Sequence, residues 1–432
     1  MFARTCYSLV AAVTLLTGTV NAENWPSWRG PSGNGLSSEK NLPAEWSPTQ
    51  NIAWKIPLPG PAGATPVVWG DRIYVTSVNE AGQLLLLAID TNNGKQVWEQ
   101  VVAKGNKNSR GDEGNSASPS PVTDGERVWS FMGDGTLGCY SKSGKEVWKI
   151  NLQDRYGQFV IQFGMSSTPV LDDGVLYFQL IHGEGNPKTR EACVVALDGA
   201  TGSQIWRVDR PSDAEAENEH SYASAVLYKD GNTKLLLTHG ADFIIAHDLK
   251  DGHEVWRCGG LNRRNDPSLR YDPTLRFVAS PVAVPGMIIA PSAKGHPILA
   301  IKGDGQGDIT DVADKHYWTY KKTPDVPSPV IVGDLAYLCM ENGNLTVLEA
   351  QSGKEVYTQA THRMRHRASP VYGDGKLYLT ARDGKVHVIQ TGREFKVLAV
   401  NDLGEDQSSS PAISNGAIYM RTFQHLWAIR KP

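Results

Sequence analysis

The sequence predicts an all-β fold, a single eight-bladed β-propeller closed by its N-terminal strand. Three observations lead to this prediction: one short phrase recurs eight times, a second phrase follows most of its copies, and the last copy lacks a fourth strand. A lone four-stranded sheet leaves both faces uncovered, whereas radial stacking of such sheets buries them. We therefore expect residues 52–432 to form one ring, preceded by an extended lead-in over residues 23–51.

The first phrase is Ser or Thr, then Pro and Val, a Gly/Asp turn, and an aromatic residue inside an apolar run. Short apolar runs bounded by turn residues are typical of strands. Two copies deviate, because the fourth lacks the Pro and the eighth has Ala in place of Val. The copies begin at Thr65, Ser120, Thr168, Ser224, Ser280, Ser328, Ser369 and Ser410.

The second phrase is Ala-x-Asp, a turn with Gly, and then Trp. Its best copies end at Trp98, Trp206 and Trp256, a looser copy ends at Trp148, and the copy after Ala300 carries an insertion. A large indole at this place supplies an apolar wedge between neighbouring blades. We assign a structural docking role, with no chemistry, to Trp54, Trp98, Trp148, Trp206 and Trp256.

The two ends of the chain complement each other. The eighth unit stops after its third strand, residues 426–429, while residues 52–56 resemble the fourth strand of the second unit, residues 146–150. A strand taken from the N-terminus would complete the last blade and remove an exposed sheet edge.

Residues 1–22 have the features of a secretory signal peptide, with Arg4, an apolar stretch over 9–16 and a small-residue cleavage pattern ending at Ala22. A buried first helix is the alternative interpretation. We expect an exported protein, periplasmic or extracellular. No later run approaches the roughly 18 apolar residues that a membrane-spanning helix needs, so we expect no transmembrane segment.

Composition narrows the class of protein. A formal net charge of −3 argues against a nucleic-acid binder, which usually carries a basic excess. The cysteines after residue 22 are far apart and lack zinc-site spacing, so we expect free buried thiols, with one disulfide left open. These are Cys139, Cys193, Cys258 and Cys339. We expect a monomer.

The docking phrase resembles the repeat of the pyrroloquinoline quinone (PQQ) superfamily of quinoprotein-type propellers. That superfamily includes the outer-membrane assembly protein BamB and PQQ-dependent dehydrogenases. The resemblance covers roughly residues 50–430, and residues 24–31 and 303–310 also resemble a secreted bacterial subgroup with PQQ-binding-like repeats. Because the docking Trp is structural, the resemblance implies the fold and leaves the activity open.

We expect a binding site on the rim with long, variable loops, at the mouth of the central channel. Polar residues shortly before the repeat Pro enter the innermost strands there; a water-filled rim without a ligand is the alternative. The candidates are His220, Tyr222, Arg276, Asp325, Arg365, His366, Arg367 and Gln407. The basic run 362–367 suits a carboxylate or phosphate; as a solvated loop it would pair with acids across the ring, such as those of 213–219.

Three functions remain open. We expect an exported, non-catalytic propeller that binds a protein, peptide or cell-envelope polymer, with no cofactor and no metal. The first alternative is a PQQ- and calcium-dependent dehydrogenase; in the alcohol-oxidising type the resemblance implies adjacent cysteines, which this chain lacks. The second is a sugar-active enzyme, which needs two suitably placed carboxylates. The stretch 303–308 is interpreted as a flexible insertion, with a calcium loop as the alternative.

Overall fold

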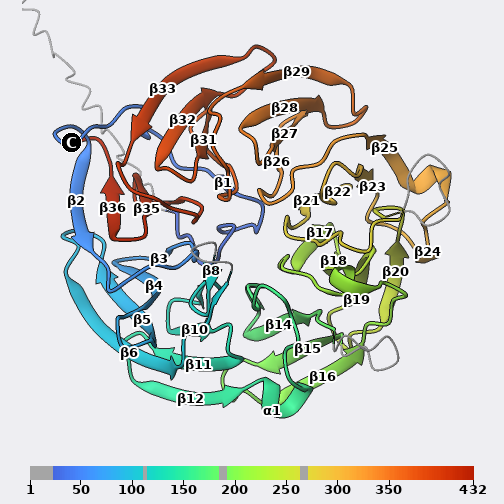
Figure 1. Cartoon of the computed structure of the whole chain (residues 1–432), viewed down its shortest axis with the longest axis horizontal. Helices are drawn as coiled ribbons and strands as arrows, with labels where there is room; N and C mark the ends of the chain where they lie inside the picture. The colour runs from blue at the N-terminus through green and yellow to red at the C-terminus, as the bar shows by residue number, and fades with distance from the viewer. Residues whose placement is uncertain (1–22, 110–113, 184–191, 263–270) are drawn as a thin grey trace, which may run out of the picture.

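The computed structural model describes residues 23–109, 114–183, 192–262 and 271–432, which form a closed ring of eight sheets (Figure 1). This confirms the predicted eight-bladed β-propeller. The predicted signal peptide, residues 1–22, lies outside the described residues. Among those that are described, no helix has the length and apolar character needed to span a membrane.

In each blade, antiparallel strands pair in chain order from the axis outwards, and we call them A to D. Blade 1 contains β3 (Val67–Trp69), β4 (Arg72–Val78), β5 (Gln83–Asp90) and β6 (Gln96–Lys104). Blade 2 contains β9 (Val122–Thr123), β10 (Arg127–Phe131), β11 (Thr136–Ser141) and β12 (Glu146–Asn151). Blade 3 contains β13 (Val170–Asp172), β14 (Val175–Leu180), β15 (Cys193–Asp198) and β16 (Gln204–Asp209). Blade 4 contains β17 (Val226–Asp230), β18 (Thr233–Gly240), β19 (Phe243–Asp248) and β20 (Glu254–Cys258).

The second half of the ring repeats this arrangement. Blade 5 contains β21 (Val282–Val284), β22 (Met287–Ala290), β23 (Ile298–Ile301) and β25 (His316–Tyr320). Blade 6 contains β26 (Val330–Val332), β27 (Leu335–Cys339), β28 (Asn344–Glu349) and β29 (Glu355–Ala360). Blade 7 contains β30 (Val371–Gly373), β31 (Lys376–Thr380), β32 (Lys385–Gln390) and β33 (Lys396–Asp402). Blade 8 begins with β34 (Ala412–Ser414), β35 (Ala417–Arg421) and β36 (His425–Ile429).

The N-terminal strand completes blade 8. Strand β2 (Ile52–Pro57) pairs antiparallel with β36, with Trp54 opposite Ala428 and Lys55 opposite Trp427. The predicted closure is therefore confirmed. The first and last strands of the ring share one sheet, so blade 8 has no missing outer strand.

The lead-in, residues 23–51, is more than an extended approach to the ring. Trp25 forms a bridge with Val68 of blade 1, and β1 (Leu36–Ser37) pairs in parallel with β30 of blade 7. Trp25 and Leu42 are fully buried in the same core as blades 7, 8 and 1. Figure 1 shows this blue segment reaching the axis of the ring beside β1.

Each docking indole lies between its own blade and the next. Its N–H donates to a backbone carbonyl in the C–D turn of the following blade, and its ring covers a glycine there. The bonds run from Trp54 to Thr91 (3.0 Å), Trp98 to Lys142 (3.0 Å), Trp148 to Gly199 (3.1 Å), Trp206 to Leu249 (3.0 Å) and Trp256 to Gly303 (3.2 Å). Trp98 and Trp148 keep part of their surface exposed.

Blade 5 has a docking residue that the sequence phrase does not reveal. The indole of Trp318 donates to the carbonyl of Ala350 in blade 6 at 2.7 Å. The insertion before it, expected to be flexible, is instead an ordered element. Its β24 (Gly307–Asp308) pairs in parallel with β20 as a fifth strand of blade 4, followed by the 3₁₀ turn η2 (Ala313–Lys315).

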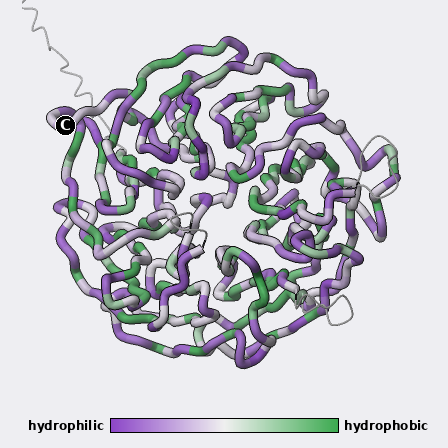
Figure 2. The backbone as a smooth tube through the Cα atoms, viewed as in Figure 1, coloured by the Kyte–Doolittle hydropathy of each residue, from purple (hydrophilic) through white to green (hydrophobic). Residues whose placement is uncertain are grey.

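The strands carry the core of the ring. Figure 2 shows hydrophobic segments gathered in the blades and hydrophilic segments in many of the connecting turns. The cysteines fit this core as small apolar side chains. Cys139, Cys193, Cys258 and Cys339 are all buried, and none forms a disulfide.

Candidate functional site

The two rims of the propeller differ in loop length. One rim carries the A–B and C–D turns, which are short except for the insertion between β23 and β25 in blade 5, and we call it the turn rim. On the opposite rim, the links that follow blades 5 to 8 are short: 321–329, 361–370, 403–411 and 58–66. The links that follow blades 1 to 4 are about twice as long: 105–121, 152–169, 210–225 and 259–281. We call these four links the half-rim.

The described parts of the half-rim contain short elements of their own and are tied together. Its elements are β7 (Asn108–Ser109), β8 (Gly114–Asn115), α1 (Gln153–Tyr156) and η1 (Ala216–Glu219). The Ser109 hydroxyl donates to the Phe163 carbonyl at 2.5 Å, and the Tyr222 hydroxyl accepts the Phe163 N–H at 3.3 Å. Arg276 pairs with Glu217 at 2.9 Å and lies over the Phe163 ring. These cross-links hold neighbouring links in one arrangement.

An open groove runs across the half-rim. Its volume is about 520 Å³, and its walls come from three successive links: Lys107, then residues 159–162, then Glu217 and His220. Val160 is 41% exposed here, an apolar side chain presented to solvent among charged neighbours. Burial lowers the pKa of His220, so this imidazole is neutral at neutral pH.

A second space lies on the axis of the ring. This central cavity has a volume of about 220 Å³ and is lined by Tyr222, Arg276 and Arg367, among others. Trp28 of the lead-in also lines it. The same indole borders a separate cavity of about 600 Å³ on the turn rim, so the lead-in divides the central channel in two.

A buried guanidinium holds this part of the lead-in in place. Arg29 donates to the carbonyls of Pro329 in blade 6 (2.8 Å), Pro370 in blade 7 (3.1 Å) and Asn34 (3.0 Å). Burial lowers the pKa of Arg29 to about 9, which still leaves it charged at neutral pH. Three carbonyl acceptors compensate for its loss of water.

The repeated Ser or Thr of the first phrase forms a ring of hydrogen bonds around the channel. The hydroxyl oxygen in each blade accepts the backbone N–H of the corresponding residue in the preceding blade. The seven accepting hydroxyls, at 2.8 to 3.1 Å, are those of Ser120, Thr168, Ser224, Ser280, Ser328, Ser369 and Ser410. Among the described residues Thr65 Oγ1 has no partner, so the ring of bonds is open between blades 8 and 1.

The structure divides the predicted site residues into groups. Tyr222, Arg276 and Arg367 meet at the central cavity, while His220 lies in the groove. Two others are buried and line neither the central cavity nor the groove: His366 Nδ1 lies 2.9 Å from the Met364 carbonyl, and Gln407 Nε2 donates to the Ala381 carbonyl at 2.7 Å. Their position before the repeat Pro placed them near the axis, but a backbone carbonyl binds one nitrogen of each side chain, and the buried Nε2 of His366 has no partner among the described residues.

The two predicted residues not yet placed, Asp325 and Arg365, interact with Glu341, as does Arg367. Arg367 lies 3.3 Å from its carboxylate and Arg365, which is 58% exposed at its side chain, lies 3.9 Å away. Burial raises the pKa of Glu341, Arg367 opposes this effect, and Asp325 adds to it. Within the basic run 362–367, Arg365 and Arg367 therefore pair with an acid of blade 6, and His362 lies 2.7 Å from Asp383 of blade 7. Glu217 of the acidic loop pairs with Arg276 instead.

Sequence reasoning missed Trp28 and Arg29. Both belong to the lead-in, and their only sequence signal is the Trp-Arg-Gly-Pro stretch, 28–31, which resembles a family feature and does not indicate a site. No local pattern shows that this stretch crosses the axis.

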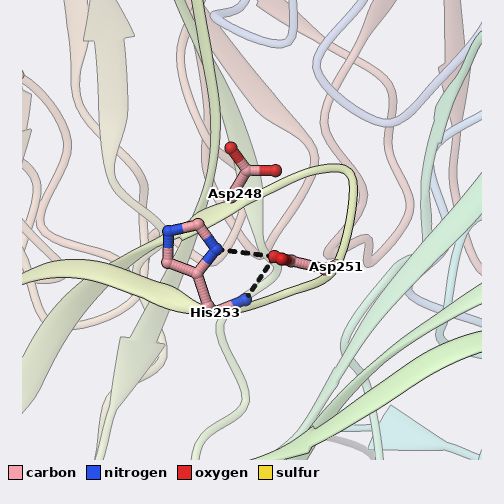
Figure 3. A group of neighbouring side chains, drawn as sticks. All are labelled: Asp248, Asp251 and His253. Carbon is pink, nitrogen blue, oxygen red and sulfur yellow. Dashed lines mark hydrogen bonds and ion pairs between the residues drawn. The ribbon is translucent and has the colours of Figure 1, made fainter.

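One group of side chains has the composition of a metal site. Asp248, Asp251 and His253 lie close together in the β19–β20 turn on the turn rim (Figure 3). Asp251 Oδ1 accepts the His253 backbone N–H at 3.1 Å and lies 2.6 Å from its Nδ1, and Asp248 accepts the Lys250 N–H at 2.7 Å. These bonds shape the turn, and they raise the pKa of His253 and lower that of Asp251. We assign the group to turn formation.

The central cavity does not fit a quinone held by calcium. Calcium takes several oxygen ligands, usually with carboxylates among them. Among the described residues that line the cavity there is no Asp or Glu. The same composition argues against glycoside hydrolysis in this cavity, because that reaction needs a pair of carboxyl groups.

Comparison with known proteins gives a family match over most of the chain. The model of the family described as "Outer membrane protein assembly factor BamB" matches residues 37–113, 88–270 and 244–430. The outer membrane protein assembly factor BamB of Burkholderia pseudomallei is 23% identical over 354 residues, covering 75% of this chain and 83% of the relative. A polyvinylalcohol dehydrogenase of a Pseudomonas species is 24% identical over 201 residues, covering 43% of this chain. The match spans only 29% of that enzyme and 28% of a second one from Sphingopyxis.

Solved structures show the same fold. BamB from Moraxella catarrhalis superposes with a TM-score of 0.62 at 13% identity, covering 88% of this chain and 99% of the other. The quinohemoprotein alcohol dehydrogenase from Comamonas testosteroni reaches a TM-score of 0.55 at 13% identity, covering 95% of this chain and 81% of the other. At this identity the likeness concerns the architecture.

Proposed function

The chain belongs to the family described as outer membrane protein assembly factor BamB, and from this premise we propose that it is an exported, non-catalytic propeller that binds a protein partner through its half-rim. The observation that carries the proposal is the asymmetry of the rim. Long links gather over blades 1 to 4, and hydrogen bonds and an ion pair connect the parts of these links that the structure describes. A surface that is ordered before binding loses less conformational entropy when a partner docks.

The groove supplies the features that a partner recognises. Val160 offers exposed apolar surface in the groove, which is also lined by Lys107 and Glu217 of opposite charge. An apolar centre bordered by polar groups is the usual anatomy of a protein interface. A peptide or an envelope polymer would bind in the same groove, and the crosslinking experiment below distinguishes these ligands from a protein.

The matches to polyvinylalcohol dehydrogenases favour a second function, a PQQ- and calcium-dependent oxidation. They cover less than half of this chain and under a third of those enzymes, whereas the BamB match covers 83% of its relative. The cavity where a quinone would lie has no carboxylate for the calcium among its described lining residues. We therefore propose that the protein works without PQQ.

Export is the remaining part of the proposal. The features of residues 1–22 support it, and the name of the family, an outer membrane protein assembly factor, agrees with an envelope location. Mass measurement of the protein from its native source should give a chain that begins at Glu23. A chain that retains Met1 and stays in the cytoplasm would contradict export.

Two exposed valines provide a matched test of the binding face. A photo-crosslinking amino acid replaces Val160, which is 41% exposed in the groove, or Val147, which is 49% exposed on the outer strand of blade 2. We expect the Val160 probe in intact cells to give one protein adduct, identifiable by mass spectrometry, which the Val147 probe does not give. Lys107→Glu in the Val160-probe protein should weaken that adduct.

Equal adducts from both positions, or none from Val160, would contradict a protein-binding half-rim. An adduct to glycan or to a short peptide would assign the groove to one of the other ligands.

A further inference from the structure

The hydroxyl ring of the channel has hydrogen-bond donors that the protein does not use. Each of the seven hydroxyls accepts one backbone N–H, and none of them donates its own proton to a described residue. A buried hydroxyl that leaves its proton unpaired loses stability, so each O–H needs an acceptor in the channel. Five of these hydroxyls line the central cavity, and all five are more than nine-tenths buried: Ser120, Thr168, Ser224, Ser369 and Ser410.

The charged groups at the cavity have the same preference for acceptors. Arg276 gives only its Nη1 to Glu217, which fixes the guanidinium and leaves its other N–H groups for the cavity. Arg367 reaches the cavity from the link between blades 6 and 7, and the Glu341 carboxylate lies 3.3 Å from it. Each guanidinium is thus held by an acid that does not line the cavity, and the described lining residues include no Asp or Glu. The cavity presents hydroxyl donors from several blades and two guanidinium groups.

We propose that the central cavity is a binding site for a small polycarboxylate anion. Several carboxylates on one small molecule match donors that converge from around a ring, and guanidinium groups bind carboxylates through paired N–H donors. An engineered cavity of about 150 Å³ accommodates benzene, so a cavity of about 220 Å³ has room for a compound of the size of citrate. Trp28 closes the inner end, so the ligand enters from the long-loop rim.

This site is separate from the groove of the proposed function. The cavity and the groove share no lining residue, and a small anion inside the ring needs no protein partner. The two proposals can therefore fail independently.

The ring itself provides a matched pair of variants. Ser224→Ala and Ser280→Ala each remove one hydroxyl that accepts one N–H, at 2.9 Å and 2.8 Å. Only Ser224 lines the cavity. Both variants therefore suffer the same loss within the ring, and only Ser224→Ala loses a donor to the ligand.

The test is isothermal titration of the full mature chain with citrate, with inorganic phosphate and with inositol, a neutral molecule of similar size. We expect citrate to bind, inositol not to bind, and phosphate to bind more weakly than citrate. Ser224→Ala should weaken citrate binding by roughly tenfold, the usual effect of a hydrogen bond to a charged group, and Arg276→Gln by more. Ser280→Ala should bind citrate as the parent does, with melting temperatures compared for all variants.

Several results would overturn the proposal. Absence of citrate binding at millimolar concentration would mean that the cavity holds only water. Equal binding of inositol would show that charge is not recognised, and tighter binding of phosphate than of citrate would contradict the polycarboxylate class. Equal weakening in Ser224→Ala and Ser280→Ala would place the effect in the ring and outside the cavity.

Discussion

The indole N–H of Trp54 donates a 3.0 Å hydrogen bond to the backbone carbonyl of Thr91. Trp54 belongs to β2, the strand that completes blade 8, and Thr91 follows β5 in the C–D turn of blade 1. The same side chain covers Gly94, whose added Cβ would lie 2.9 Å from the indole. One strand from the N-terminus therefore both completes the last blade and docks it on the first.

The first prediction follows from this double role. Deleting residues 23–56 should expose the edge of β36 and remove Trp25 and Leu42 from the core. An unpaired strand edge promotes association between molecules. We expect a lower melting temperature by calorimetry and aggregation by light scattering. A truncated chain with unchanged melting temperature and solubility would show that closure of the ring does not depend on this strand.

The second prediction concerns the docking residues. Trp256→Ala should cost about 3–5 kcal/mol of unfolding free energy, the usual range for a large core aromatic, because Trp256 is fully buried. Trp98→Ala should cost less, because its indole keeps part of its surface in solvent. Urea unfolding of the two variants checks the order, and a reversed order would contradict the assigned packing.

A double-mutant cycle separates docking from simple burial. Gly144 has a φ of +89°, and an added Cβ would lie 2.7 Å from the Trp98 ring. Gly144→Ala should therefore destabilise the parent more than it destabilises Trp98→Ala, because removing the indole removes the clash and leaves only the backbone strain. Additive losses in the two backgrounds would mean that the two residues do not contact.

The third prediction is a loss of stability in mild acid. Burial lowers the pKa of His239 to about 3, and those of His247 and His366 to about 4. Because these folded-state values lie below the ordinary value of 6.5, the unfolded chain takes up protons first as the pH falls. The unfolding free energy should therefore fall from about pH 6.5 to about pH 4, by up to about 3 kcal/mol for each of His247 and His366.

Urea unfolding at pH 7 and pH 5 measures this loss. His366→Gln should reduce the difference between the two values. His253→Gln, at an exposed position of the turn rim, should not reduce it and should make it slightly larger, because the raised pKa of His253 adds stability as the pH falls. An identical pH dependence in the parent and in His366→Gln would contradict the buried neutral imidazole.

The repeats predicted the blades and the closing strand because each repeat carries its own strand and turn signals. Trp318 was missed because an insertion, itself paired with β20, separates it from the rest of its phrase. The sequence could not show that the lead-in closes the inner end of the cavity. Arg29 holds the lead-in there by contacting Pro329, which is 300 residues away in the chain. The repeat predicted that His366 and Gln407 lie near the axis. It could not predict their hydrogen-bond partners, because these depend on how the chain packs around them.

The central claim is that this propeller binds and does not oxidise, and a turnover assay tests it most directly. The mature chain is incubated with PQQ and Ca²⁺, and dye reduction is followed with alcohols, aldose sugars and polyvinyl alcohol, beside a quinohemoprotein alcohol dehydrogenase as positive control. We predict no reduction above the rate of PQQ alone, because the described cavity lining has no carboxylate to hold the calcium. Turnover that disappears when the Ca²⁺ is chelated would contradict the binding role and identify a dehydrogenase.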